Sequence, residues 1–199
     1  MENILLVFVA ALFLSSVAAH GSKCHRPMGK SPFDQEKFAG DWYVVARAST
    51  YPMMAEDTIC TKINYQSEPV GNVTRTNLKI TITNKDGSDA VIDTKGQSIY
   101  PGHNAVTQVA WKGPKDDVWK GVAHKSIMAT DYENFAITYF CKERYDEKTD
   151  DFGKITIVDL WGRRPSLDES LVDTIKSIMT SFDFDTATIV DVNNSGCEK

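Results

Sequence analysis

The sequence has one long hydrophobic run, no block of positive charge and no Cys-x-x-Cys pair. The run, residues 4–14, is too short to cross a bilayer, and no second run of spanning length follows it. The formal net charge is −5, with acidic and basic residues interspersed, so the chain offers no basic surface for nucleic acid or for an anionic membrane. The sequence therefore indicates an acidic globular protein without a membrane-spanning segment.

The first 19 residues have the pattern of a secretory signal peptide. Small residues ending at Ala19 follow the apolar run, although the positive charge before it is weak, which leaves a membrane anchor as the alternative. We expect cleavage after Ala19 and one domain over residues 20–199, because no Pro-rich linker, low-complexity segment or repeat divides that part. The protein is therefore expected to be secreted and extracellular.

The cysteines support the same compartment. Cys24, Cys60, Cys141 and Cys197 are even in number, and an exported chain pairs them, with three pairings open. Their spacing matches neither a zinc ribbon nor a redox motif, so no metal site is expected. Paired cysteines leave no thiolate nucleophile, and no Ser, His and acid constellation is visible, so we expect no enzyme.

Two histidines need separate consideration, because one of them would have to reach the iron of a bound heme. His103 lies in a predicted loop and His124 on a predicted strand, and neither has an evident partner. We interpret both as surface histidines and expect no cofactor.

Two sequons fit the glycan acceptor pattern of an exported protein. They begin at Asn72 and Asn193, and each lies in a polar stretch. Asn72 is the better candidate, because the preceding Pro and Gly mark an exposed turn.

Alternation of apolar and polar residues predicts an antiparallel β-protein. In the first strand, Val44, Ala46 and Ala48 share a face with Trp42, whereas Arg47 lies on the opposite face. The pattern fits a closed up-and-down barrel of about eight strands or a sandwich. Strands are predicted over residues 42–49, 60–66, 75–83, 90–93, 96–100, 105–111, 118–128, 135–144 and 154–161, with a last short one over 187–192.

Two helical segments are predicted. Residues 33–38 form one short turn capped by Asp34. After the last long strand, Ser166 and Glu169 form a capping box, and the apolar residues from Leu171 to Phe182 recur at helical spacing. The apolar face of this second helix is expected to lie on the outer wall of a barrel.

Three motifs together resemble those of the lipocalins: Gly40-Asp41-Trp42, Thr130-Asp131-Tyr132 and Gly162-Arg163-Arg164-Pro165. Their order and spacing make the resemblance specific, and it is nearest to the apolipoprotein D-like and insect bilin-binding branch of that family. It implies an all-β fold, an eight-stranded antiparallel up-and-down barrel with one C-terminal α-helix packed on the outside. Residues 115–125 depart from the family pattern and form a longer segment.

The resemblance also implies how the barrel is held together. It pairs Cys24 with Cys141 and Cys60 with Cys197. It places Trp42 and Arg163 at the closed end, with the guanidinium over the indole, as structural residues.

A small hydrophobic ligand inside the barrel is the function that the resemblance implies. The ligand could be a lipid, a retinoid, a sterol-like compound or a tetrapyrrole pigment. The residues implied to face it are Val44, Ala46, Ile63, Tyr65, Val109, Trp111, Lys125, Ile127, Ala136, Thr138, Phe140, Ile157 and Asp159.

Two members of this set, Lys125 and Asp159, are charged. They must pair with each other, reach solvent or meet a polar group of the ligand, unless a bulge turns one of them outward. A biogenic amine bound by Asp159 is thus one alternative function. A lipocalin that inhibits a protein partner through its loops is the other.

Overall fold

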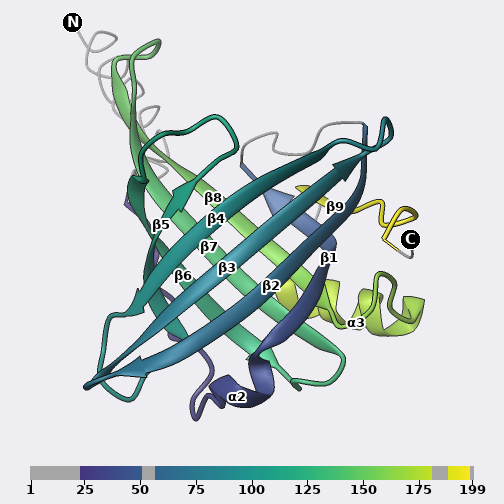
Figure 1. Cartoon of the computed structure of the whole chain (residues 1–199), viewed down its shortest axis with the longest axis horizontal. Helices are drawn as coiled ribbons and strands as arrows, with labels where there is room; N and C mark the ends of the chain where they lie inside the picture. Colours follow the sequence, from purple (N-terminus) through teal and green to yellow (C-terminus); the bar gives the residue numbers. More distant parts are fainter. Residues whose placement is uncertain (1–22, 51–56, 181–187, 198–199) are drawn as a thin grey trace, which may run out of the picture.

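Antiparallel strands close into a barrel with a helix on its outside (Figure 1). The computed structural model describes residues 23–50, 57–180 and 188–197. The elements are α2 (Gln35–Phe38), β1 (Gly40–Ser49), β2 (Thr58–Val70), β3 (Val73–Asn84), β4 (Asp89–Ser98), β5 (Val106–Lys112), β6 (Lys120–Thr130), β7 (Phe135–Asp146), β8 (Asp151–Gly162), α3 (Glu169–Thr180) and β9 (Ile189–Asp191).

Strand β1 closes the barrel, because it pairs with both ends of the strand order β2-β3-β4-β5-β6-β7-β8. Its first half lies against β2, with Trp42 opposite Ile63, and its second half lies against β8, with Ala48 opposite Val158. The short strand β9 pairs with β1 beyond the end of the β2 pairing. The predicted eight-stranded up-and-down barrel is confirmed, and the sandwich is excluded.

Two of the predicted strands form one continuous strand. The sequence indicated two short strands over residues 90–93 and 96–100, but β4 runs without a break through Thr94 and Lys95. Thr94 lies opposite Trp111, and Lys95 lies opposite Ala110, so the ladder with β5 continues through the gap between the two predicted strands.

A bulge in β1 changes which side chains face inward. The register with β8 shifts between Val44 and Ala46, so Val45 is the extra residue. Ala46 then lies opposite Leu160 and belongs with it to the outer cluster beneath α3. Arg47 faces the interior instead. The predictions that Ala46 lines the ligand site and that Arg47 lies outside are therefore wrong.

The helices are in the predicted places. Asp34 caps α2 by accepting a hydrogen bond from the Lys37 amide at 3.0 Å, as expected. Helix α3 begins later than its predicted capping box, because Asp168, rather than Ser166, accepts the Ser170 amide at 3.0 Å. Its inner face packs on the barrel wall through Val172, Ile175 and Met179.

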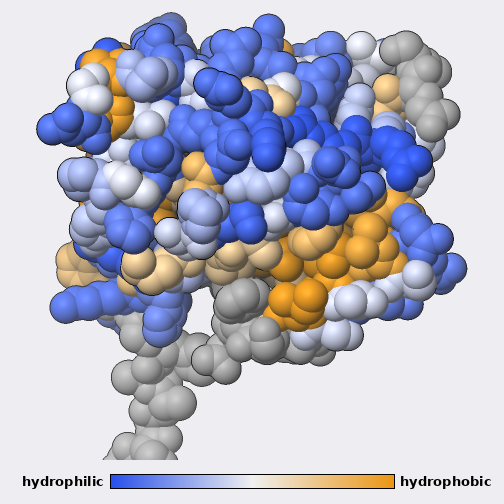
Figure 2. Space-filling view, turned by 90° about the horizontal axis from the view of Figure 1, so that it is seen from below, coloured by the Kyte–Doolittle hydropathy of each residue, from blue (hydrophilic) through white to orange (hydrophobic). Residues whose placement is uncertain are grey.

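The outside of the barrel is not uniformly polar. Seen from below, hydrophobic residues gather in one area on the side where α3 packs, whereas most of the remaining face is hydrophilic (Figure 2). Leu167 and Leu171 are among the partly buried residues of the cluster that α3 shares with the barrel wall.

Both disulfides have the pairing that the resemblance implied. Cys24 is bonded to Cys141 and Cys60 to Cys197, across 117 and 137 residues of sequence. In the chain-entropy model a bridge over so long a loop stabilises the fold by about 4 kcal/mol. The first bridge fastens residues 24–30 over β6, where the Pro27 carbonyl accepts the Ser126 hydroxyl at 3.0 Å.

Some sequence predictions lie outside the described residues. These are the signal peptide with its cleavage after Ala19 and the end of the second helix at Phe182. Within the described ranges, no helix has the length and apolar character needed to cross a membrane.

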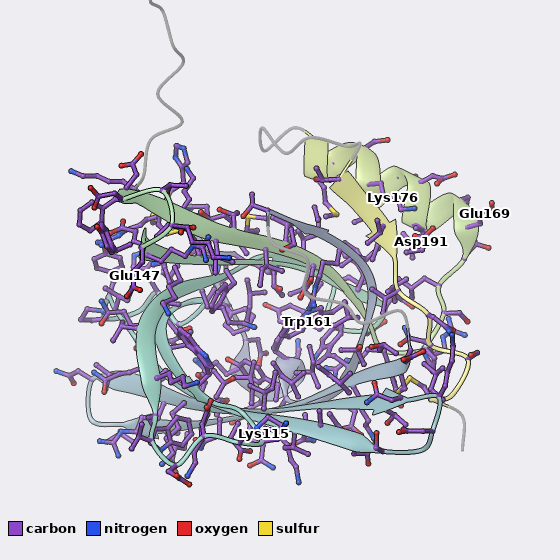
Figure 3. All side chains as sticks on the ribbon, turned by 90° about the horizontal axis from the view of Figure 1, so that it is seen from above. Lys115, Glu147, Trp161, Glu169, Lys176 and Asp191 are labelled. Carbon is purple, nitrogen blue, oxygen red and sulfur yellow. A yellow bond between two sulfur atoms is a disulfide. The ribbon has the colours of Figure 1, made fainter. Side chains whose placement is uncertain are left out.

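Aromatic rings seal the barrel end that α2 crosses, which we call the closed end. Phe38 stacks on Trp42 with ring centroids 4.8 Å apart, and Trp161 lies 6.4 Å from Trp42. Trp161 is visible inside the ring of strands in Figure 3. Below these rings, the Arg163 guanidinium lies 3.8 Å from the centre of the Trp42 ring, as the resemblance implied.

Arg163 also holds the backbone of the closed end. It donates hydrogen bonds to the carbonyls of Lys37, Ala39, Asp41 and Tyr132, at 2.7–3.1 Å. One side chain thus ties together α2, β1 and the β6–β7 turn.

Replacing Arg163 with Met should lower the free energy of unfolding by about 2–4 kcal/mol, since four carbonyls lose a charged donor. Urea denaturation measures this loss. The exposed neighbour provides the control, because Arg164→Met should change stability by no more than about 0.5 kcal/mol. Equal effects of the two substitutions would contradict the role of Arg163.

Candidate functional site

The interior wall contains all of the predicted ligand-facing residues except Ala46. The strand register places them there. Phe140 lies opposite Ile157 on one neighbouring strand and opposite Lys125 on the other, and Thr138 lies opposite Asp159. The correct faces follow from the alternation, because these strand segments are regular.

Five of these residues belong to the packed closed end. They are at most 3% exposed and form one cluster with Phe38, Trp42 and Trp161. Packing against the sealing rings leaves them little surface for a ligand. The five residues are Val44, Ile63, Tyr65, Ile127 and Ala136.

The part of the interior farther from α2 is less tightly filled. Ile92, Trp111 and Phe140 face inward by register, lie outside the closed-end cluster and remain partly exposed. An inward-facing side chain in a closed barrel keeps accessible surface where the interior is not filled by other side chains or where it opens to solvent. This half of the barrel therefore has apolar and aromatic walls with accessible surface.

A buried ion pair crosses the interior between β1 and β8. Arg47 Nε lies 2.6 Å from Asp159 Oδ1, and Arg47 Nη2 lies 2.8 Å from Oδ2, with 12% and 10% of the two side chains exposed. Burial opposes the guanidinium charge, but attraction and hydrogen bonding from Asp159 outweigh it and raise the pKa of Arg47. Trp161 Nε1 also approaches Oδ2, at 3.5 Å.

Sequence reasoning missed Arg47 because the bulge inverts its side of the strand. The available signal was the run Val44-Val45-Ala46, where three consecutive apolar residues interrupt the alternation. Two of the alternatives for Lys125 and Asp159 are excluded: neither side chain is turned outward, and they do not pair with each other, because Asp159 pairs with Arg47.

Lys125 lies beside this ion pair without joining it. Its ammonium is 4.2 Å from the centre of the Trp161 ring, and in the described ranges it forms no ion pair. Burial lowers the pKa of Lys125 to about 8, with Asp159 opposing the shift and Arg47 adding to it. A second interior lysine, Lys142, lies 4.7 Å from the ring centre of Trp111.

Three hydroxyls on the β2 and β3 walls are buried without a hydrogen-bond partner in the described part of the chain. They are Thr61 Oγ1, Tyr65 Oη and Thr76 Oγ1. Burial raises the pKa of Tyr65, so its hydroxyl keeps its proton. Unpaired buried hydroxyls are costly, so Thr61 and Thr76 are places where water or a polar group of a ligand gains a hydrogen bond, whereas Tyr65 lies in the packed closed end.

The expectation of two surface histidines is wrong for His124. It is 7% exposed beneath residues 24–30, with Nε2 3.2 Å from the Ser126 hydroxyl. Burial and the nearby Arg26 lower the pKa of His124. His103 lies in the β4–β5 loop beside Tyr100. Across the described ranges, no group of three or more His, Cys, Asp or Glu residues is placed to hold a metal.

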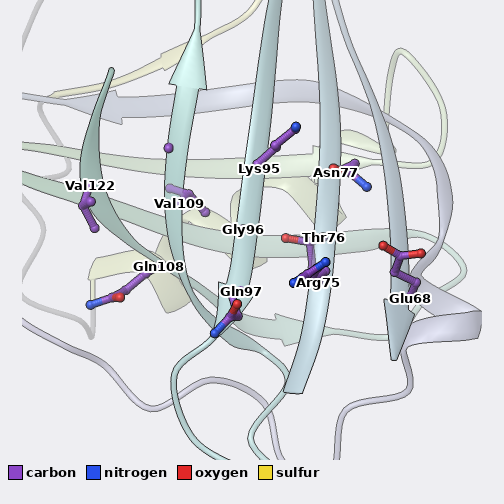
Figure 4. Close-up of a pocket in the computed structure, with 11 residues that line it drawn as sticks. Glu68, Arg75, Thr76, Asn77, Lys95, Gly96, Gln97, Gln108, Val109 and Val122 are labelled. Atoms are coloured by element: carbon purple, nitrogen blue, oxygen red, sulfur yellow. The ribbon is translucent and has the colours of Figure 1, made fainter. Parts of the chain in front are cut away.

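Two hollows lie outside the interior wall. One, of about 500 Å³, surrounds Gly96 and is lined mostly by polar side chains, including Arg75, Lys95 and Gln108 (Figure 4). The other, of about 670 Å³, lies between α3 and the C-terminal segment, where Lys176 and Asp191 form an ion pair at 2.8 Å. Their polar linings make both less suited to a hydrophobic ligand than the interior wall.

The predicted glycan acceptors are accessible. Asn72 is exposed in the β2–β3 turn, and Asn193 is exposed after β9, with its side-chain oxygen accepting the Ser195 amide at 3.1 Å. Their modification remains a prediction.

Replacing Asp159 with Asn should lower the free energy of unfolding by about 2–4 kcal/mol, because Arg47 keeps its buried charge without a counter-ion. The double variant Arg47→Met/Asp159→Leu should recover most of this loss, as chemical denaturation can show. The exposed pair Lys62–Asp41 is the control: Asp41→Asn should cost no more than about 1 kcal/mol. Additive effects of the two interior substitutions would contradict a coupled pair.

Comparison with known proteins agrees with this architecture. The model of the lipocalin / cytosolic fatty-acid binding protein family matches residues 39–196. Rat apolipoprotein D is 27% identical over 198 residues, covering 98% of this chain and 95% of that protein. Bovine apolipoprotein D is 28% identical over 184 residues, covering 89% and 87%.

Solved structures show the same fold at lower identity. Apocrustacyanin C2 aligns with a TM-score of 0.58 and 19% identity, covering 82% of this chain and 81% of that one. A biogenic amine-binding protein aligns with a TM-score of 0.63 and 13% identity, covering 87% and 88%. The family match extends from the strand that closes the barrel to the C-terminal tail, and the chain therefore belongs to the lipocalin / cytosolic fatty-acid binding protein family.

Proposed function

We propose that the protein is a secreted carrier or scavenger of one small hydrophobic ligand, bound noncovalently inside the barrel and without catalysis. The observation that carries this proposal is the accessible surface of the inward-facing residues Ile92, Trp111 and Phe140, outside the cluster that seals the closed end. Each 100 Å² of apolar surface that leaves water on binding contributes about 2.5 kcal/mol. The aromatic walls suit a flat or flexible apolar molecule.

Secretion has independent support. The apolar run of residues 4–14 fits a signal peptide, and the two disulfides fit an oxidising compartment. The exposed sequons at Asn72 and Asn193 are also consistent with a secreted protein. The name of the apolipoprotein D relatives associates them with lipoproteins.

A biogenic amine is the second candidate ligand, because a structural neighbour is described as a biogenic amine-binding protein. In this chain, both carboxylate oxygens of Asp159 are already within hydrogen-bond distance of Arg47. An amine would have to displace the guanidinium and leave it unpaired. The hydrophobic carrier is therefore the better-supported function.

Filling the interior should abolish binding. Ala123 faces inward opposite Val109, whereas its neighbour Val122 is 65% exposed on the outside. We expect Ala123→Trp to lower the affinity for a hydrophobic fluorescent probe by about 10-fold or more, because the indole occupies the ligand's space. Val122→Trp should leave that affinity unchanged. Probe titration gives the affinities, and thermal unfolding verifies that both variants fold.

Native mass spectrometry of the secreted protein supplies a direct test. A copurified small molecule that is lost from Ala123→Trp but kept by Val122→Trp supports binding inside the barrel. If both variants bind the probe as the original protein does, the ligand does not bind in the interior. The milder Ala123→Leu substitution repeats the test if the indole prevents folding.

A further inference from the structure

One histidine on the outer wall of the barrel is covered by the N-terminal segment. His124 lies on the outward face of β6, between the inward-facing Ala123 and Lys125, yet it is only 7% exposed. Residues 24–30, which we call the strap, cross β6 at this point and exclude water from the ring. His124 is therefore a titratable group enclosed between two parts of the chain, and the proposed carrier function makes no use of it.

The strap is fastened to the barrel at both ends. At one end Cys24 is bonded to Cys141 on β7. At the other end the Lys30 amide donates to the Ile127 carbonyl on β6 at 2.8 Å. Between these ends a carbonyl of the strap accepts a side-chain hydroxyl of β6. The hydrogen bonds can break while the disulfide holds, so the strap can lift from β6 and return without unfolding of the barrel.

Hydrogen bonding beneath the strap fixes the neutral form of His124. The Ser126 hydroxyl has one hydrogen, and it donates this hydrogen to the Pro27 carbonyl at 3.0 Å. Its oxygen therefore accepts a hydrogen bond from His124 Nε2, which lies 3.2 Å away, so the neutral ring carries its hydrogen on Nε2. In the described part of the chain, Nδ1 has no hydrogen-bond partner.

A second proton on His124 would go to Nδ1 and place a positive charge under the closed strap. Within the described ranges, the ring forms no ion pair with a carboxylate. The groups that face it are one cation and three uncharged groups: Arg26 on the strap, Gln108 on β5, and Tyr139 and Cys141 on β7. A buried charge without a partner is costly, so the protonated ring is more stable in water.

We propose that the strap is an acid-sensitive switch, closed over neutral His124 and opened when this histidine takes up a proton. Opening uncovers the outer face of β6 around His124 and Ser126, while the disulfide keeps the strap attached to β7. The inference goes beyond the proposed function, because it does not depend on a ligand inside the barrel.

The direction of the pH dependence follows from the burial of the ring. Burial and the nearby Arg26 lower the pKa of His124 while the strap is closed. In the open strap the ring is in water and has an ordinary histidine pKa of about 6.5. As the pH falls below that value, the open form binds a proton that the closed form resists, so the open population rises. Above it, the closed strap keeps its full advantage.

Hydrogen exchange of the Lys30 amide measures the opening, because its bond to Ile127 holds only in the closed strap. We expect its protection, corrected for the intrinsic exchange rate, to fall about 10-fold between about pH 7.5 and pH 5. His124→Gln keeps a donor for Ser126 but cannot titrate, so the protection should change less than about 2-fold. His25→Gln, at an exposed histidine of the same strap, is the matched control and should behave as the original protein.

A second variant tests the charge beside the ring. Arg26→Gln removes the nearby cation, so the protonated ring is repelled less under the closed strap and the loss of Lys30 protection should be smaller. Amides in the β7–β8 ladder should stay protected throughout, which separates strap opening from unfolding of the barrel.

Three outcomes would overturn the proposal. The first is constant Lys30 protection across this pH range in the original protein. The second is an unchanged loss of protection in His124→Gln, which would assign the effect to another group, such as Glu143, whose carboxylate accepts the Cys24 amide at 2.9 Å. The third applies even if that variant does not fold: an NMR titration of the His124 ring in the original protein that proceeds without any change in Lys30 protection.

Discussion

Closure of the barrel through β1 is the constraint on which the rest of the structure depends. This strand pairs with β2 through its first residues and with β8 and β9 through its last ones. A strand that turns from one neighbour to another must bend, and a bulge accommodates a bend by adding one unpaired residue. Val45 is that residue here. Because of this bulge every later side chain of β1 changes sides, and the bulge thereby determines which β1 side chains face the interior.

The interior charge follows from that change of side. Without the bulge, Ala46 and Ala48 would face the lumen and Asp159 would have no cation on β1. With it, the alanines make room for α3 on the outer wall, and Arg47 meets Asp159 at hydrogen-bond distance. One extra residue thus provides a flat surface for the helix and a partner for a buried carboxylate.

The fold could be predicted from the sequence because its signals are local and repeated. Alternation located the strands, Asp34 marked the first helix, and the three motifs identified the family. The site was predictable wherever the strands stay regular, as at Phe140 and Ile157. It was not predictable at Arg47, because strand parity fails at a bulge, or at His124, because its burial depends on residues 24–30 crossing β6. The run Val44-Val45-Ala46 is a local signal for the first error, whereas the second comes from a tertiary contact that no local pattern records.

The aromatic and arginine seal at the closed end also limits how the proposed carrier would exchange its ligand. With that end sealed, a bound molecule and its replacement would use the same opening, so the first must leave before the second can bind. The residence time would then depend on how firmly the innermost group of the bound molecule is held.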